Sequence, residues 1–174
     1  MADNSFKLLV VDIDGTLVGR EGTISAEDRE ALARVADLGI KVSVSTGRAF
    51  QACSEVLNEL SLDGYHVFCD GALVYSPTHQ SEVYAQPLDR AVVRRAIEFA
   101  RLNEMSIDLY SATRYFVERE TWSAMVHRDF FGVPPVMVDF DKLCERERII
   151  KAGLVAISPV SYTHLRAHET SLHL

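Results

Sequence analysis

The first 70 residues alternate three short apolar segments with two amphipathic ones, and this alternation restricts the fold more than any other feature of the chain. The apolar segments are 6–11, 40–44 and 66–69, and apolar residues recur at helical spacing in 26–38 and 49–60. Lys7 is the one polar residue of the first segment, which is typical of a strand buried on both faces of a parallel sheet. Strands linked through helices form such sheets with right-handed crossovers. The sequence therefore predicts an α/β fold.

Composition excludes several classes of protein. The chain has 174 residues, of which 48% are hydrophobic and 25% charged, close to the average of globular domains. It has no apolar run of about 18 residues, so we expect no membrane span. A net charge of −7 without a basic run longer than Arg94–Arg95 argues against a nucleic-acid partner. The N-terminus lacks the pattern of a secretion signal, and the three widely spaced cysteines fit reduced thiols, so we expect a cytoplasmic protein.

The second half of the chain follows a different plan. Paired extended segments are expected first, and Asp89 is a good N-cap for a helix, with Leu88 placed to pack on Val93. Further strands are expected at 106–110, 115–118 and 135–138, a helix at 122–131, and a strand at 149–157 interrupted at 151–153. We interpret Asp141 as the N-cap of a last helix. This pattern predicts an α+β domain at 87–158, after a first domain at 1–86.

The last sixteen residues, 159–174, differ from the rest of the chain. They hold three of its six histidines and show neither strand nor helix periodicity. The segment resembles the read-through of a sequencing adapter, so we expect it to be a non-native tail. The alternative is a small metal-binding tract of His164, His168 and His173.

Asp12 and Asp14 follow the first apolar segment directly. Two carboxylates this close repel each other unless a cation lies between them, which favours Mg²⁺. Asp12 could attack a phosphorus atom, and Asp14 could protonate the leaving oxygen and later deprotonate water. Gly15 would free backbone N–H groups for phosphate oxygens, and Thr16 would hold the loop. The alternative, an acidic turn at Asp14–Gly15, fits the whole apolar-DxDGT pattern less well.

A second polar motif, Thr46-Gly47-Arg48, follows the next predicted strand. A hydroxyl at a strand end, followed by glycine and a helix start, can bind a phosphoryl oxygen through its side chain and a backbone N–H. Taken alone, the motif would fit an ordinary helix N-cap with an exposed Arg48. Carboxyl ends of parallel strands meet at one edge of a sheet, so both motifs are expected at the same site.

The sequence resembles the haloacid-dehalogenase-like phosphohydrolases, and among them the Cof-type sugar-phosphate phosphatases. VVDIDGTLVG at 10–19 is similar to their first motif, STGRAF at 45–50 to their second, and CDGALVYS at 69–76 to the segment after their third strand. The resemblance covers 5–158. It implies a Rossmann-like core with an inserted α+β cap of the C2 type, both partial here. It also implies a small phosphorylated metabolite as substrate, with Asp12 as nucleophile, Asp14 as acid and base, and Thr46 as phosphate ligand. Mg²⁺ would bind Asp12 and the backbone carbonyl of Asp14.

The chain departs from the family pattern in three places. Asp70 replaces the usual Asn of the third segment. No Gly-Asp pair of the late acidic metal motif occurs after residue 86, and Lys151 is the one lysine in a position to be considered for the catalytic lysine. The resemblance implies that both missing motifs follow Ser158 in a longer protein. We therefore expect a catalytically incomplete fragment. A receiver-type signalling module is the alternative, but DxDGT and TGR fit it badly.

The remaining conspicuous side chains favour structural roles. His66 and His127 are expected to be partly exposed, and Cys69 to be a small buried residue. Trp122, Phe130 and Phe131 are expected to pack inside the second domain rather than to stack on a substrate.

Overall fold

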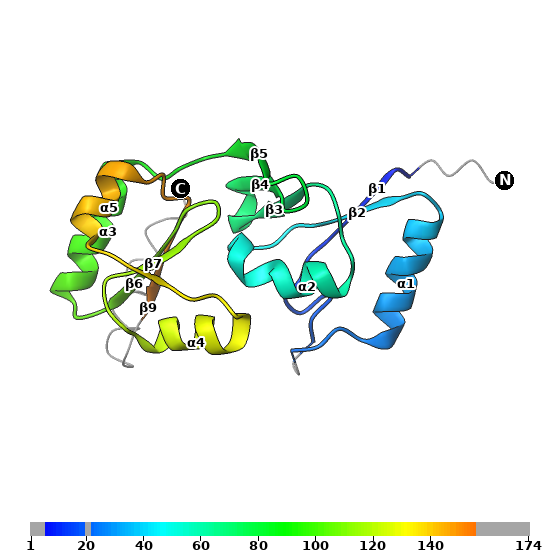
Figure 1. Cartoon of the computed structure of the whole chain (residues 1–174), viewed down its shortest axis with the longest axis horizontal. Coiled ribbons are helices and arrows are strands. Elements are labelled where there is room, and N and C mark those ends of the chain that lie inside the picture. Colours follow the sequence, from blue (N-terminus) through cyan, green and yellow to red (C-terminus); the bar gives the residue numbers. More distant parts are fainter. Residues whose placement is uncertain (1–5, 20–21, 156–174) are drawn as a thin grey trace, which may run out of the picture. The chain divides into compact units, whose positions relative to one another are not determined.

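The computed structural model describes residues 6–19 and 22–155. Two compact units divide between Gln86 and Pro87, and each has its own sheet and helices (Figure 1). No helix in these ranges is long and apolar enough to cross a membrane. The tail at 159–174, with its three histidines, lies outside the described residues.

The first unit is built around two parallel strands. β1 (Leu8–Val11) pairs with β2 (Lys41–Val44), and helix α1 (Ala26–Asp37) connects them. Ser25 caps this helix by accepting a hydrogen bond from the backbone N–H of Asp28 at 3.0 Å. A short 3₁₀ helix, η1 (Phe50–Cys53), and α2 (Ser54–Glu59) lead from β2 to β3 (His66–Phe68). A parallel bridge between Ser45 and Val67 aligns β3 with the end of β2, so the predicted α/β fold is confirmed.

A turn and a hairpin complete this unit. The turn η2 (Cys69–Gly71) leads into β4 (Leu73–Ser76), which is antiparallel to β3 and to β5 (Ser81–Ala85). The predicted pairing of extended segments is therefore confirmed. The turn carries the chain from the end of β3 back toward the end of β2, which matters for the site described below.

The prediction that the first strand is buried on both faces is wrong. Leu8 is 56% exposed and Val10 50%, whereas Leu9 and Val11 are half-buried. Side chains alternate between the faces of a strand, so Leu8 and Val10 share one face with Phe6, which is 72% exposed. Within the described ranges β1 pairs with β2 alone, which leaves its other edge without a partner strand, and the face of Phe6, Leu8 and Val10 is exposed.

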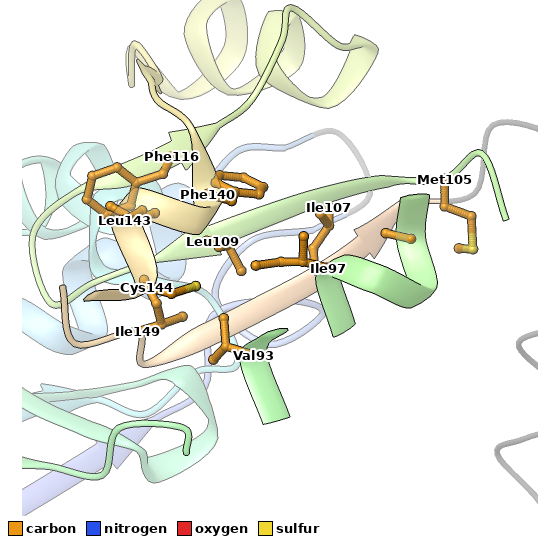
Figure 2. Packing of buried hydrophobic residues seen from close by; sticks show 11 residues of the cluster. Val93, Ile97, Met105, Ile107, Leu109, Phe116, Phe140, Leu143, Cys144 and Ile149 are labelled. Carbon is orange, nitrogen blue, oxygen red and sulfur yellow. The ribbon is translucent and has the colours of Figure 1, made fainter. Parts of the chain in front are cut away.

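The second unit is a four-stranded sheet with helices α3 (Arg90–Leu102) and α5 (Phe140–Arg146) on one face. Its strands are β6 (Ser106–Tyr110), β7 (Tyr115–Val117), β8 (Val136–Met137) and β9 (Lys151–Val155), in the order β8-β7-β6-β9. The predicted helix at 122–131 is α4 (Trp122–Phe131). The core between sheet and helices is shown in Figure 2. It consists of Val93, Ile97, Ala100, Met105, Ile107, Leu109, Phe116, Phe140, Leu143, Cys144 and Ile149.

Two predictions in this unit need correction. The N-cap of α5 is Asp139, whose side chain accepts hydrogen bonds from the N–H groups of Asp141 and Lys142. Asp141 lies in the first turn and pairs with Arg101 at 3.3 Å. The strand β9 runs without a break through Gly153, because each of its residues from 151 to 155 has an antiparallel partner on β6. Ladder hydrogen bonds outweigh the poor strand propensity of the glycine.

The aromatic residues of α4 also differ from expectation. Trp122 is 69% exposed and Phe130 68%, so neither packs inside the unit as predicted. The buried side of α4 is formed by the small residues Ser123 and Ala124. These let the helix lie close to its neighbours, and the large rings are left facing solvent. Phe131 makes ring contacts of the expected kind, with centroid distances of 5.6 Å to the half-buried His127 and 5.5 Å to Phe130.

His66 is fully buried, which contradicts its predicted partial exposure. Its Nδ1 accepts a hydrogen bond from the backbone N–H of Val44 at 3.3 Å, and its Nε2 has no hydrogen-bond partner among the described residues. The imidazole thus links β3 to β2. Desolvation on burial lowers the pKa of His66, although Asp63 acts in the opposite direction.

Acid is therefore expected to destabilise the protein through His66. Its pKa is lower in the folded chain than in the unfolded one, so the unfolded chain takes up a proton first as the pH falls below about 6.5. The contribution of neutral His66 to the free energy of unfolding is fully present above that pH. It decreases as the pH falls through the pKa of His66 in the folded state. Melting temperatures of the wild type and of His66→Gln, which does not titrate, should diverge between pH 7.5 and 5. Parallel curves would contradict the assignment.

Candidate active site

Both predicted motifs lie where β1 and β2 end. Asp12 directly follows β1, and Ser45 and Thr46 directly follow β2. The two strand ends are joined by a hydrogen bond from the N–H of Ser45 to the carbonyl of Val11 at 2.9 Å. The N–H of Thr46 donates to the carbonyl of Val67 on β3 at 3.0 Å. The parallel pairing thus brings the acidic motif and the TGR motif to one edge of the sheet, as expected for α/β folds.

The acidic loop is anchored by apolar side chains and by its own turn. Ile13 is fully buried and Leu17 is 5% exposed, which fixes the backbone that carries Asp12 and Asp14. Gly15 adopts φ 76°, a conformation that favours glycine, and its N–H donates to the carbonyl of Val18 at 3.0 Å. This N–H is therefore used inside the loop. What Gly15 contributes is the turn.

Asp12 is exposed at the end of β1. The hydroxyl of Thr16 donates to Asp12 Oδ2 at 3.3 Å, in agreement with the expected role of Thr16 in holding the loop. Within residues 6–19 and 22–155 no group donates a hydrogen bond to the second carboxylate oxygen, Oδ1. An exposed carboxylate on a fixed strand end can act as a nucleophile or bind a cation.

Arg48 connects the two motifs through Asp14. Its Nε donates to Asp14 Oδ2 at 2.8 Å and its Nη2 to Asp14 Oδ1 at 2.5 Å, the paired geometry in which arginine binds carboxylates. A third donor, Nη1, reaches the carbonyl of Ala52 at 3.2 Å. The Arg48 side chain is only 20% exposed, so it is held in place. Hydrogen bonding to Arg48 lowers the pKa of Asp14, and Asp14 is ionised at neutral pH. The sequence had suggested a phosphate contact or an exposed side chain for Arg48, and had not suggested its pairing with Asp14.

Thr46 is buried, with 4% of its surface exposed. Its Oγ1 accepts a hydrogen bond from the N–H of Arg48 at 3.1 Å, which leaves the hydroxyl proton for another acceptor. The backbone of 46–48 therefore forms a tight turn closed by the threonine hydroxyl. This turn sets the direction of both the hydroxyl and the Arg48 side chain.

The turn after β3 packs on the TGR motif. The N–H of Cys69 donates to the carbonyl of Arg48 at 2.9 Å, and the N–H of Asp70 to the carbonyl of Thr46 at 3.2 Å. Cys69 and Asp70 both have positive φ, 53° and 55°, which is unusual outside glycine. Cys69 is buried, as predicted. The sequence analysis did not predict that Asp70 lies against the TGR motif. The available signal was that Asp70 replaces the usual Asn of the family.

The oxygen ligands at this edge fit Mg²⁺ in part. Among the described residues Asp12 Oδ1 accepts no hydrogen bond, and magnesium commonly binds one or two carboxylates and keeps several waters. The side chain of Asp14 is paired with Arg48, so only its backbone carbonyl remains for a metal. No group of three or more His, Cys, Asp or Glu side chains in the described ranges is arranged to hold a metal ion. Lys151, the one candidate for the catalytic lysine, begins β9 in the second unit.

Comparison with known proteins gives the same family over most of the chain. The model of the haloacid dehalogenase-like hydrolases matches residues 9–158. A 5-amino-6-(5-phospho-D-ribitylamino)uracil phosphatase of Bacillus subtilis is 36% identical over 73 residues, which are 42% of this chain and 29% of that protein. The HMP-PP phosphatase of Yersinia pestis is 24% identical over 138 residues, 79% of this chain and 50% of that protein. The chain thus spans half or less of these curated relatives.

Among solved structures, a haloacid dehalogenase-like hydrolase from Bacteroides thetaiotaomicron superposes with a TM-score of 0.79 at 24% identity. The match covers 94% of this chain and 62% of that one. At this identity the likeness establishes the fold. Both compact units are therefore present in a protein of known architecture.

Proposed function

Because the chain belongs to the haloacid dehalogenase-like hydrolases, we propose that it is the front part of a phosphatase acting on small phosphorylated metabolites. One observation carries this proposal: Asp12 at the end of β1 faces the same sheet edge as Thr46 at the end of β2. A nucleophile and a phosphate ligand are needed at one place for phosphoryl transfer. The parallel pairing of the two strands provides that place.

In the proposed reaction Asp12 is the nucleophile. One of its carboxylate oxygens forms a bond to phosphorus while the bond from phosphorus to the ester oxygen breaks, giving an aspartyl-phosphate. The leaving oxygen takes a proton from Asp14. A water molecule then attacks the phosphorus and gives its proton to Asp14. The bond to Asp12 breaks, and inorganic phosphate leaves.

Asp14 and Arg48 act together in this scheme. The Arg48 pair stabilises the ionised form of Asp14, which is the form that accepts a proton from water. The first step needs protonated Asp14, so the ion pair between Arg48 and Asp14 must break before that step. A phosphate dianion offers Arg48 an alternative partner of the same geometry. Thr46, Gly47 and Arg48 would bind this phosphate, and Gly15 would supply the turn that presents Asp14.

Mg²⁺ fits this scheme as the cofactor. Asp12 and the backbone carbonyl of Asp14 would hold it, and the relatives' larger size leaves room for further ligands. When bound, the ion neutralises the negative charge that Asp12 and a phosphate bring together. The second unit is proposed to be the cap of the enzyme. Candidate substrates are 5-amino-6-(5-phospho-D-ribitylamino)uracil and HMP-PP, after which two relatives are named, and sugar phosphates are a further class.

A catalytically incomplete fragment is the second candidate. It is favoured by the lack of any three-residue metal cluster in the described ranges and by the 62% coverage of the solved relative. Such a chain would bind phosphate and Mg²⁺ weakly and turn over nothing.

The test is phosphate release from p-nitrophenyl phosphate and from a panel of phosphorylated metabolites, with and without Mg²⁺. Turnover that needs Mg²⁺ is expected for the phosphatase. Binding of beryllium fluoride, a phosphate mimic that attaches to carboxylates, is measured on the same chain by ¹⁹F NMR. Binding without turnover would identify the incomplete fragment, and neither binding nor turnover would contradict both.

A further inference from the structure

The glycine of the TGR motif is required by a neighbouring side chain. Gly47 has no positive φ, so its own backbone conformation is open to other residues. A Cβ built on it would lie 2.8 Å from Asp70 Oδ1, closer than real Cβ atoms approach other heavy atoms, and 3.3 Å from Oδ2, which is a tight contact. The space where a side chain at position 47 would begin is thus filled by the Asp70 carboxylate.

Asp70 reaches this place because of an unusual turn. Its φ of 55° is left-handed, a conformation that Asp and Asn tolerate better than most residues. Its N–H donates to the carbonyl of Thr46, and the N–H of Cys69 donates to the carbonyl of Arg48. The turn therefore donates hydrogen bonds to the carbonyls of Thr46 and Arg48, the residues on either side of Gly47. The Asp70 side chain packs on Gly47 itself.

We propose that Asp70 is a positioning residue for the phosphate-binding loop and that Gly47 and Asp70 form one interlocking pair. The planar carboxylate packs against the Gly47 backbone and keeps Thr46 and Arg48 in the geometry that receives a phosphate. This inference rests on the proposed function, since it assigns the loop to phosphate. It goes beyond it by giving a role to Asp70, which replaces the family's usual residue.

The shape of the Asp70 side chain should matter more than its charge. Asn has the same shape and also tolerates a left-handed φ, so Asp70→Asn is expected to stay within about twofold of the wild type in KM and kcat. Asp70→Gly removes the side chain without straining the turn. It is expected to raise KM for p-nitrophenyl phosphate about tenfold with kcat little changed, because phosphate binding is lost equally in ground and transition states.

A double-mutant cycle tests the pair. Gly47→Ala should lower the melting temperature and raise KM about tenfold in the wild type, but should add little in the Asp70→Gly background, where its Cβ has space. Gly19→Ala is the matched control, because a Cβ at Gly19 meets no atom of the described residues within 4 Å and its φ is not positive. Both parameters should be unchanged in that control.

The outcomes separate the inference from the proposed function. Coupled melting temperatures together with coupled KM values would support the pair and its role. Additive effects of the two substitutions, or an Asp70→Asn variant as impaired as Asp70→Gly, would overturn the inference while leaving the phosphatase intact. If no variant, including the wild type, turns over or binds phosphate, the proposed function fails. The role of Asp70 then fails with it, whatever the melting temperatures show.

Discussion

Asp12→Asn is expected to lower Mg²⁺-dependent phosphate release by about a thousandfold or more. The amide has the same size as the carboxylate but lacks its nucleophilicity, and it binds a divalent cation poorly. Asp12 is exposed, and in the described part of the chain its side chain is hydrogen-bonded to Thr16 alone, so the fold should be unaffected. Circular dichroism and the melting temperature should match the wild type.

Asp37→Asn is the control for this substitution. Asp37 is also exposed and ends α1 in the same unit, away from the strand ends that carry the motifs. Its replacement should leave phosphate release unchanged. Activity retained in Asp12→Asn would remove Asp12 from the role of nucleophile. Equal losses in both variants would indicate a general effect of charge instead.

Phe140→Ala is expected to lower the free energy of unfolding of the second unit by about 3–5 kcal/mol. Phe140 is fully buried at the start of α5 and belongs to the core between sheet and helices (Figure 2). Its removal leaves a cavity and takes apolar surface out of the contact that attaches α5 to the unit. Urea unfolding followed by the fluorescence of Trp122, the one tryptophan and a residue of this unit, measures the change.

Phe130→Ala supplies the matched control, with the same chemical change on a side chain that is 68% exposed. Its effect is expected to stay within about 0.5 kcal/mol. A similar loss of unfolding free energy in both variants would mean that Phe130 is buried and that this face of α4 is not exposed. A small cost for Phe140→Ala would contradict the position of the core.

Much of the first unit could be predicted because the signals are local. The apolar runs ending at Val11 and Val44, and the helix between them, predict the β1–β2 pair and thereby the meeting of Asp12 with Thr46. Hydrophobic periodicity identifies such elements without knowledge of their surroundings. The N-caps Ser25 and Asp89 were predicted for the same reason, since a cap needs only the next few residues.

Features that depend on distant partners could not be predicted. The ion pair of Arg48 with Asp14 joins residues that are 34 positions apart in the sequence, and hydrophobic periodicity does not indicate such a pair. Asp70 reaches Gly47 only through a left-handed turn, which two non-glycine residues rarely form. The sequence could not distinguish Asp139 from Asp141 as the N-cap of α5 for a related reason. Both carry the preferred side chain, and Arg101 from α3 engages the second.

The uncovered face of β1 has a consequence for how the chain behaves at high concentration. Phe6, Leu8 and Val10 form a row of apolar side chains on a strand that has one partner within the described ranges. The unpaired N–H and C=O groups along the other edge of such a strand are a template for pairing between molecules, and the apolar side chains favour that contact. At neutral pH the net charge of −7 keeps molecules apart. Near the isoelectric point of about 5.3 the net charge and this repulsion vanish, so concentrated samples in mildly acidic buffers are expected to associate through β1.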